Sequence, residues 1–175
     1  PGVSLVQRDK NTDEIYLGYS SPKTQSRVYS YNLNSKEKNL VKEQQIPSGH
    51  NPENYIVERV NCKSHDGRMV PITITRHKNT KLDGSANLLL YGYGSYGSSM
   101  SPSFSSTRLS LINRDIIWVT AHIRGGMERG MKWWKEGKLL NKKNTFEDYI
   151  ASAKYLIENK YTSENKIIGM GGSVG

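Results

Sequence analysis

The sequence has 175 residues and a formal net charge of +9, with 25 lysines and arginines against 16 aspartates and glutamates. A chain of this length can bury a domain-sized hydrophobic core. Hydrophobic residues make up 35% of the chain and glycine adds another 16 residues, a composition that excludes disorder throughout. The single cysteine, Cys62, excludes an internal disulfide and any multi-cysteine zinc site, and it suits a reducing compartment.

The positive charge is spread among acidic residues rather than gathered into one cluster. Lys36, Lys38 and Lys42 are interrupted by Glu37 and Glu43, and no such group is interleaved with aromatic residues on which bases could stack. The amino-terminal residues lack the hydrophobic region of a signal peptide, and no apolar run approaches the ~18 residues of a membrane-spanning helix. We therefore expect a cytoplasmic protein with no nucleic-acid or membrane partner.

The first part of the chain is typical of short strands separated by turn residues. Because a three-stranded meander of ~35 residues buries little apolar surface, we expect it to be part of something larger. The next segment, residues 46–55, carries two prolines and a glycine and is our candidate linker. The three expected strands are Glu14–Ser21, Ser26–Leu33 and Lys38–Gln45.

The pattern changes after the linker, where continuous apolar runs predict strands that are covered on both faces. Amphipathic segments between these runs predict helices, so the order of elements indicates a mostly parallel sheet with flanking helices. The expected strands are Tyr55–Asn61, Met69–Arg76, Ala86–Gly92, Asp115–Ile123 and Asn165–Met170. The expected helices are Pro102–Asn113, Glu128–Glu136 and Thr145–Lys160.

The last of these helices has the clearest pattern. Asn144 followed three residues later by Glu147 resembles a capping box. Apolar residues then recur at steps of three and four and predict one buried stripe, made of Phe146, Ile150, Ala153, Leu156 and Ile157.

The chain ends in Gly171-Gly172-Ser173-Val174-Gly175, a G-x-S-x-G string directly after a predicted strand. In a nucleophile elbow, a serine sits on a tight, strained turn between a strand and a helix, and small flanking residues make that turn possible. The string alone is a weak signal, and an ordinary glycine-rich loop remains the alternative.

A second glycine-rich segment, YGYGSYG at residues 91–97, follows the first of the buried strands. In α/β-hydrolases the loop at this place supplies part of the oxyanion hole. Glycines let the backbone approach closely, and a tyrosine hydroxyl could act as a donor. The alternative is an aromatic turn that packs on the core.

Five blocks in the same order resemble the prolyl oligopeptidase family of serine peptidases, and within it most closely the oligopeptidase B branch. The resemblance covers the whole chain and implies that residues 1–46 form the last blade-like segment of a β-propeller. It implies that residues 47–175 form the amino-terminal part of an α/β-hydrolase catalytic domain. The blocks are YGYGSYG at 91–97, FSSTRLSLINR at 104–114, HIRGGMERGMKWWKEGK at 122–138, KKNTFEDY at 142–149 and GGSVG at 171–175.

The resemblance also assigns roles to individual residues. It implies that Ser173 is the nucleophile, and that the Tyr93 hydroxyl and the backbone N–H of Val174 stabilise the oxyanion. Tyr96 is implied to lie near the first substrate pocket. The chain departs from the family pattern at Val174, where a backbone donor is nevertheless kept, and at Met127, where the family has glycine.

A serine nucleophile needs a histidine base that is oriented by a carboxylate, and in α/β-hydrolases both follow the serine in sequence. All four histidines precede Ser173. His122 is the one near a strand end that is expected to face the candidate site, and we expect a structural polar role for it rather than a role as the base. We therefore expect these residues to be inactive alone, with the rest of the catalytic domain supplied by a complementary chain or further residues.

The favoured interpretation is an acyl-enzyme peptidase that cleaves short peptides after Arg or Lys and needs no metal or organic cofactor. Two alternatives remain open at this point. One is an esterase or acylaminoacyl peptidase of the same fold, and the other is a non-catalytic binding or regulatory fragment that contacts anionic partners.

Overall fold

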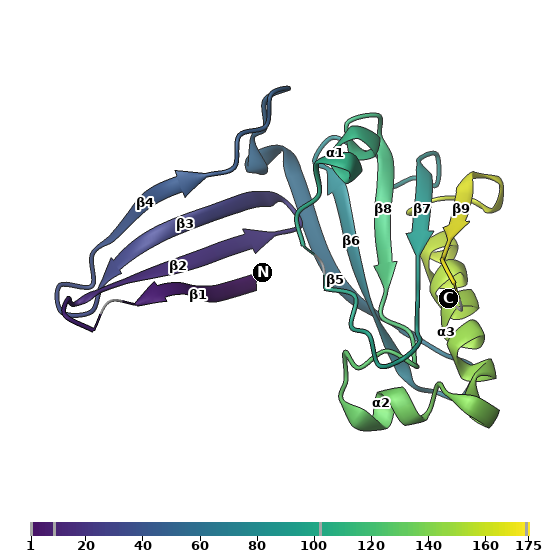
Figure 1. Ribbon diagram of the computed structural model, residues 1–175. Helices are drawn as coiled ribbons and strands as arrows, with labels where there is room; N and C mark the ends of the chain where they lie inside the picture. Colours follow the sequence, from purple (N-terminus) through teal and green to yellow (C-terminus); the bar gives the residue numbers. More distant parts are fainter. Residues whose placement is uncertain (1, 9, 102, 174) are drawn as a thin grey trace. The chain divides into compact units, whose positions relative to one another are not determined.

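Two structural units make up the protein in the computed structural model, which describes residues 2–8, 10–101, 103–173 and 175. Unit 1 contains the chain up to Asn54 and a segment that ends at Thr107. Unit 2 contains Tyr55–Ser101 and Arg108–Gly175. Their strands and helices are drawn in Figure 1.

Unit 1 is an antiparallel meander in which each strand pairs with the next along the chain. The sequence predicted three of its strands and missed the first, so the expectation of a three-stranded meander was wrong. The missed strand pairs with its neighbour from Gly2 to Arg8 although all its side chains are exposed, and pairing rather than burial therefore defines it. The strands are β1 (Gly2–Arg8), β2 (Glu14–Ser21), β3 (Thr24–Asn32) and β4 (Lys38–Glu43).

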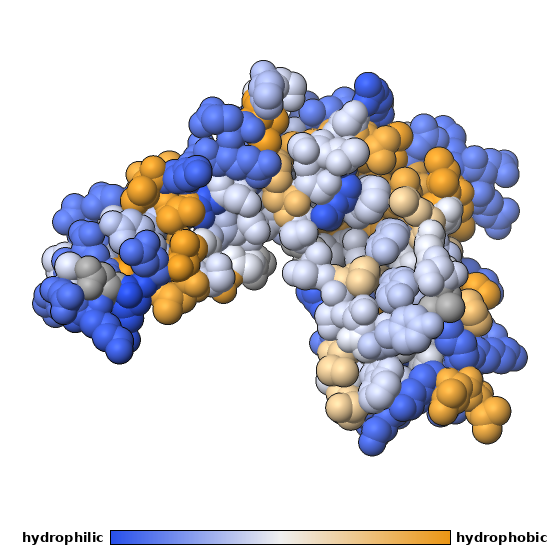
Figure 2. All heavy atoms as spheres, viewed as in Figure 1, coloured by the Kyte–Doolittle hydropathy of each residue, from blue (hydrophilic) through white to orange (hydrophobic). Residues whose placement is uncertain are grey.

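The two edge strands of unit 1 carry hydrophobic side chains at the surface. Figure 2 shows hydrophobic patches among hydrophilic side chains over this unit. This sheet therefore leaves apolar surface unburied, as expected of a piece that needs further packing. More than half of the side chain is exposed at Val3, Leu5, Val6, Leu40 and Val41.

Unit 2 contains a mixed sheet with the strand order β5-β6-β8-β7-β9. β7 is parallel to both β8 and β9, whereas β6 is antiparallel to β5 and β8. The sequence predicted all five of these strands to within three residues at each end. They are β5 (Tyr55–Lys63), β6 (Met69–His77), β7 (Asn87–Tyr91), β8 (Ile116–Ala121) and β9 (Ile167–Met170).

The core of unit 2 forms around the central strands of this sheet. Apolar side chains from β6, β7 and β8 are fully buried there, and Leu156 from α3 (Lys143–Glu158) packs against them. Burial alternates along β7, where Leu88 and Leu90 are fully buried and Leu89 between them is only partly buried. The fully buried strand residues are Val70, Ile72, Ile74, Leu88, Leu90, Ile117 and Val119.

The two shorter helices begin later than the sequence predicted. α1 spans Ser106–Ile112 and α2 spans Met131–Lys135. α2 cannot start at Glu128 because Gly130 has a φ of 84°, outside the helical range. The expected proline near the start of the first helix, Pro102, lies outside the described residues.

Helix α3 lies along one face of the sheet (Figure 1), but it turns a different side to the core than the sequence predicted. Phe146 and Ile150, expected in the buried stripe, are 52% and 47% exposed. The expected burial of Leu156 is confirmed, but the other buried positions are displaced by about one residue, or about 100° around the helix. The buried residues of α3 are Thr145, Asp148, Ser152 and Leu156.

The capping box expected at the start of α3 is also wrong. The helix starts at Lys143, with Lys142 at the N-cap and no side-chain cap. The Asn144 amide instead donates to the carbonyl oxygen of Glu136, at 2.9 Å. A tertiary contact has replaced the local one.

Across the described part of the chain, no helix combines the length and the apolar character that crossing a membrane requires.

Candidate active site

The candidate site lies where β7 and β9 end side by side. The two strands are parallel, and Tyr91 is paired with Met170 at their carboxyl ends. The N–H of Gly92 donates to the carbonyl oxygen of Met170 at 3.1 Å, so the pairing continues into the loop after β7. The two glycine-rich segments that sequence analysis singled out therefore leave the sheet at the same edge.

Ser173 lies on a tight turn that follows β9 directly. Its φ is 55°, in the left-handed region that residues other than glycine seldom adopt. The turn is closed by the N–H of Gly175, which donates to the carbonyl oxygen of Gly172 at 2.8 Å. Serine is exposed in this turn, and a strained serine between a strand and its following segment is the local geometry of a nucleophile elbow.

The loop that follows β7 touches this turn at Tyr93. A Cβ atom placed on Gly175 would lie only 2.6 Å from the carbonyl oxygen of Tyr93 and 2.8 Å from its ring. Only glycine fits at this close approach. Tyr93 also lines a pocket of about 280 Å³. The two glycine-rich segments and α3 line the rest of this pocket, with residues that include Gly92, Gly171, Gly175, Thr145, Phe146 and Tyr149.

Ser173, in the neighbouring turn, and Tyr96, in the loop of Tyr93, are not among the described residues that line this pocket. Tyr96 has a φ of 54°, and its side chain is 75% exposed. Val174, whose backbone N–H was the second expected oxyanion donor, lies outside the described residues.

The loop between Tyr93 and Tyr96 is anchored by a lysine that sequence analysis did not single out. The Lys142 ammonium donates to the carbonyl oxygen of Gly94 at 2.9 Å and to the hydroxyl oxygen of Ser95 at 2.6 Å. Burial lowers the pKa of Lys142. The anchor fixes the backbone of the residues directly after Tyr93.

A buried ion pair beneath the site joins the loop after β8 to helix α3. Arg124 is 1% exposed and Asp148 is 0% exposed. The guanidinium donates to both carboxylate oxygens of Asp148, at 2.6 and 2.8 Å, and the backbone N–H of Arg124 adds a third bond at 3.0 Å. This pair explains why α3 turns a polar stripe toward the core.

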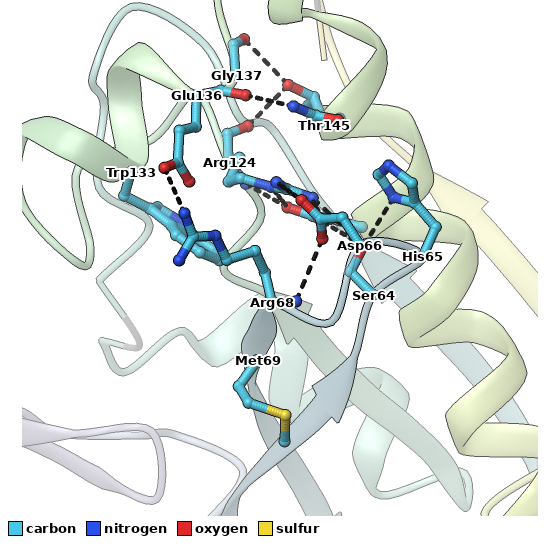
Figure 3. A network of polar contacts seen from close by, with 12 residues as sticks. Ser64, His65, Asp66, Arg68, Met69, Arg124, Trp133, Glu136, Gly137 and Thr145 are labelled. Carbon is cyan, nitrogen blue, oxygen red and sulfur yellow. Dashed lines mark hydrogen bonds and ion pairs between the residues drawn. The ribbon is translucent and has the colours of Figure 1, made fainter.

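The network extends to the β5–β6 turn. Figure 3 shows Ser64, Asp66 and Arg124 pointing toward one another. Asp66 accepts two bonds from the guanidinium, and the Ser64 hydroxyl donates to Asp148 at 2.6 Å. Burial alone would lower the pKa of Arg124, but its bonds to Asp148 and Asp66 outweigh burial and raise it.

Thr145 completes this support from the start of α3. Its hydroxyl lies 2.8 Å from the carbonyl oxygen of Arg124 and 3.2 Å from that of Gly137 (Figure 3). A Cβ on Gly94 would meet the Thr145 methyl group and the Arg124 carbonyl at 2.5 and 2.7 Å. The loop that carries Tyr93 is thus packed directly on the Arg124 segment.

His122, which follows β8, has a structural environment. Its Nε2 lies 2.8 Å from the Thr73 hydroxyl, and its carbonyl oxygen accepts a bond from the Trp133 indole. Its side chain is 1% exposed. No histidine belongs to the described lining of the pocket beside Tyr93.

Comparisons with known proteins identify similar sequences. The model of the prolyl oligopeptidase family matches residues 102–175. Dipeptidyl aminopeptidase BI of Pseudoxanthomonas mexicana is 40% identical over 95% of this chain, and Protease 2 of Moraxella lacunata is 37% identical over 98%. The chain is thus similar to members of the prolyl oligopeptidase family over nearly its whole length. It spans about a quarter of the length of these relatives, 23% and 25% respectively.

A solved member of the family has the same fold over nearly the whole chain. Prolyl oligopeptidase B from Galerina marginata, bound to a 25mer macrocyclization substrate, superposes with a TM-score of 0.90 at 31% identity. The match covers 99% of this chain and 24% of that protein. The predicted fold class is confirmed: a portion of an α/β-hydrolase domain preceded by a segment of β-propeller type.

Sequence analysis missed the supporting residues of the site. One feature of the sequence could have indicated the Arg124–Asp148 pair: Asp148 is an acidic residue within the apolar pattern of a helix that packs on a sheet. Lys142 left no local signal, because its partners are backbone and hydroxyl oxygens about 48 residues away in sequence.

Proposed function

We propose that these residues form the nucleophile-bearing part of a serine peptidase active site. The Ser173 hydroxyl oxygen attacks the carbonyl carbon of a peptide bond while a base takes its proton. The base then gives this proton to the leaving amine as the C–N bond breaks and the acyl-enzyme forms. The Tyr93 hydroxyl and the N–H of Val174 stabilise the negative oxygen in the transition state. Water then hydrolyses the acyl-enzyme and frees the serine.

One observation carries the proposal. Ser173 occupies a strained turn directly after β9, and this turn contacts the Tyr93 loop. Strain at a residue other than glycine persists only where the surrounding structure holds it, and such residues cluster at functional sites. Residues such as Lys36 and Leu139 also have a positive φ, so the conformation supports the proposal only together with the contact between this turn and the Tyr93 loop.

The base and its carboxylate partner come from outside these 175 residues in this proposal. A histidine base must lie within hydrogen-bond reach of the serine, and the four histidines here do not line the pocket of Tyr93. A polypeptide limited to these residues is therefore inactive as a peptidase. Removal of the base from such a site costs several orders of magnitude in rate.

The proposed substrates are short peptides cleaved after Arg or Lys. Protease 2 of Moraxella lacunata, one of the similar proteins, supports assignment to the oligopeptidase B branch, and the solved relative with a bound 25mer supports a peptide ligand. We place the propeller-type segment at residues 1–46 and the hydrolase portion at 47–175. Tyr96 is proposed to face the first substrate pocket once a peptide is bound.

A chimera tests this function. Residues 1–175 replace the segment of Moraxella lacunata Protease 2 with which they align, and Protease 2 then supplies the rest of the catalytic domain. Hydrolysis is measured with matched fluorogenic peptides that carry Arg, Lys or Pro before the cleaved bond, and with an ester. We expect cleavage after Arg and Lys that is abolished by Ser173→Ala and kept by Ser99→Ala, a matched control at an exposed serine.

Equal hydrolysis by the Ser173→Ala chimera would contradict the nucleophile assignment. Cleavage after Pro alone would keep the peptidase and overturn the proposed specificity. The 175-residue polypeptide itself is expected to give no hydrolysis above the background of its own Ser173→Ala variant.

A further inference from the structure

Tyr149 connects the two strands that lead to the proposed site. It lies in α3, and its hydroxyl donates to the carbonyl oxygen of Leu90 on β7 at 2.6 Å. The same hydroxyl oxygen accepts a bond from the backbone N–H of Met170 on β9 at 3.2 Å. One hydroxyl group therefore bridges β7 and β9 across their sheet pairing.

The bridge is placed symmetrically with respect to the reacting groups. Leu90 lies three residues before Tyr93, and Met170 lies three residues before Ser173. Each contact is made at the carboxyl end of its strand, where the chain leaves the sheet. A change in the spacing of these two strand ends is thus transmitted through short segments to both side chains.

The surroundings of Tyr149 are shaped around its ring and hydroxyl. A Cβ placed on Gly92 would lie 2.7 and 2.9 Å from ring carbons of Tyr149, and one placed on Gly169 would lie 3.0 Å from its hydroxyl oxygen. Gly169 is the sheet partner of Leu90. The ring fills a space that both glycines leave open, so its position is fixed from both strands.

We propose that Tyr149 is a positioning residue, whose hydroxyl sets the spacing between the nucleophile Ser173 and the oxyanion donor Tyr93. This inference rests on the proposed function and adds a residue to it. Tyr149 acts through the backbone of β7 and β9, not on the substrate. Reacting groups displaced by about 1 Å can lose about 100-fold in rate, so a bridge at this place has a catalytic consequence.

The hydroxyl is suited to the task because it remains protonated. Burial raises the pKa of Tyr149, and the N–H of Met170 opposes this only in part. A neutral phenol can donate to one backbone group and accept from another at the same time, which a phenolate cannot.

Removal of the hydroxyl alone separates positioning from packing. Tyr149→Phe keeps the ring between the two glycines and loses both hydrogen bonds. In the Protease 2 chimera we expect kcat to fall about tenfold with KM changed less than twofold, as expected for the loss of neutral hydrogen bonds. Tyr155→Phe is the matched control, since it removes one hydroxyl from the same helix and should leave kcat unchanged.

A second measurement uses the 175-residue chain itself and needs no activity. Selective labelling with ¹⁵N-methionine reports the amide of Met170 by NMR, assigned with Met170→Leu. Tyr149→Phe should increase the hydrogen-exchange rate of this amide about fivefold to tenfold. The Tyr155→Phe control should leave that rate unchanged.

The outcomes distinguish this inference from the function on which it rests. If Ser173→Ala abolishes hydrolysis while Tyr149→Phe keeps the kcat of the parent chimera, Tyr149 does not position the site. If the Met170 amide exchanges at the same rate in both proteins, the hydroxyl bridge does not hold the strand ends together. A chimera whose hydrolysis survives Ser173→Ala contradicts the function, while the exchange experiment still tests the bridge.

Discussion

Removal of the Asp148 carboxylate tests the buried ion pair beneath the active site. Asp148→Ala leaves the Arg124 guanidinium, which is 1% exposed, without its fully buried partner. It also removes the acceptor for the Arg124 backbone N–H and for the Ser64 hydroxyl. The substitution therefore leaves the guanidinium with the partly exposed Asp66 carboxylate and takes the buried acceptor away from two neutral donors.

The expected loss is large compared with the stability of a typical domain. Breaking a buried pair by removing one partner costs about 3–5 kcal/mol. Domains of this size unfold with free energies of about 5–15 kcal/mol. We therefore expect Asp148→Ala to lose about 4 kcal/mol, whereas Asp66→Ala, at a side chain that is 34% exposed, should lose about 1 kcal/mol.

Urea denaturation followed by tryptophan fluorescence measures the unfolding of unit 2, which contains the ion pair. All three tryptophans, Trp118, Trp133 and Trp134, belong to this structural unit. Asp148→Asn is measured in parallel, since it keeps the side-chain volume and removes the charge. A free energy of unfolding within about 1 kcal/mol of the parent chain for both Asp148 variants would refute the reasoning.

Two further predictions concern unit 2. Burial and the neighbouring Glu58 raise the pKa of Tyr161 to about 12 from its ordinary value of 10.0; the folded chain then holds a proton that the unfolded chain loses, so the free energy of unfolding should fall as pH rises from 10 to 12. Tyr161→Phe should remove this part of the decline in urea denaturation, and an unchanged pH profile would contradict it. Lys142→Met should lose about 1.5 kcal/mol of stability and lower kcat in the chimera, because Gly94 and Ser95 lose their anchor; kcat equal to the parent value would show that the anchor is not needed.

The strands of unit 2 were predictable because their signal is local. The run from Leu88 to Leu90 is apolar at every position, even though Leu89 is only partly buried. The first strand of unit 1 had no such signal. It forms by pairing with β2 while its side chains remain exposed.

The facing of α3 was not predictable from its apolar residues. Periodicity pointed to Phe146 and Ile150, but the burial of Asp148 against Arg124 turns the helix by about one residue. Asn144 was assigned to a cap for a similar reason. The capping-box pattern considers only neighbouring residues, whereas the Asn144 side chain bonds the carbonyl oxygen of Glu136, outside α3.

The segments that carry Ser173 and Tyr93 lie side by side because they follow β9 and β7, which are parallel neighbours and end at the same edge of the sheet. The bridge made by Tyr149 does not follow from any local rule. Its partners lie 59 and 21 residues away in sequence, and only the packed structure brings them to one hydroxyl.

Covalent labelling of the chimera tests the central claim most directly. The chimera is incubated with a fluorophosphonate, which reacts with an activated serine, and the labelled residue is identified by peptide mass spectrometry. The account predicts one adduct on Ser173, formed more slowly in Tyr93→Phe and absent from Ser173→Ala. An active chimera labelled at another serine, with Ser173 unmodified, would contradict it.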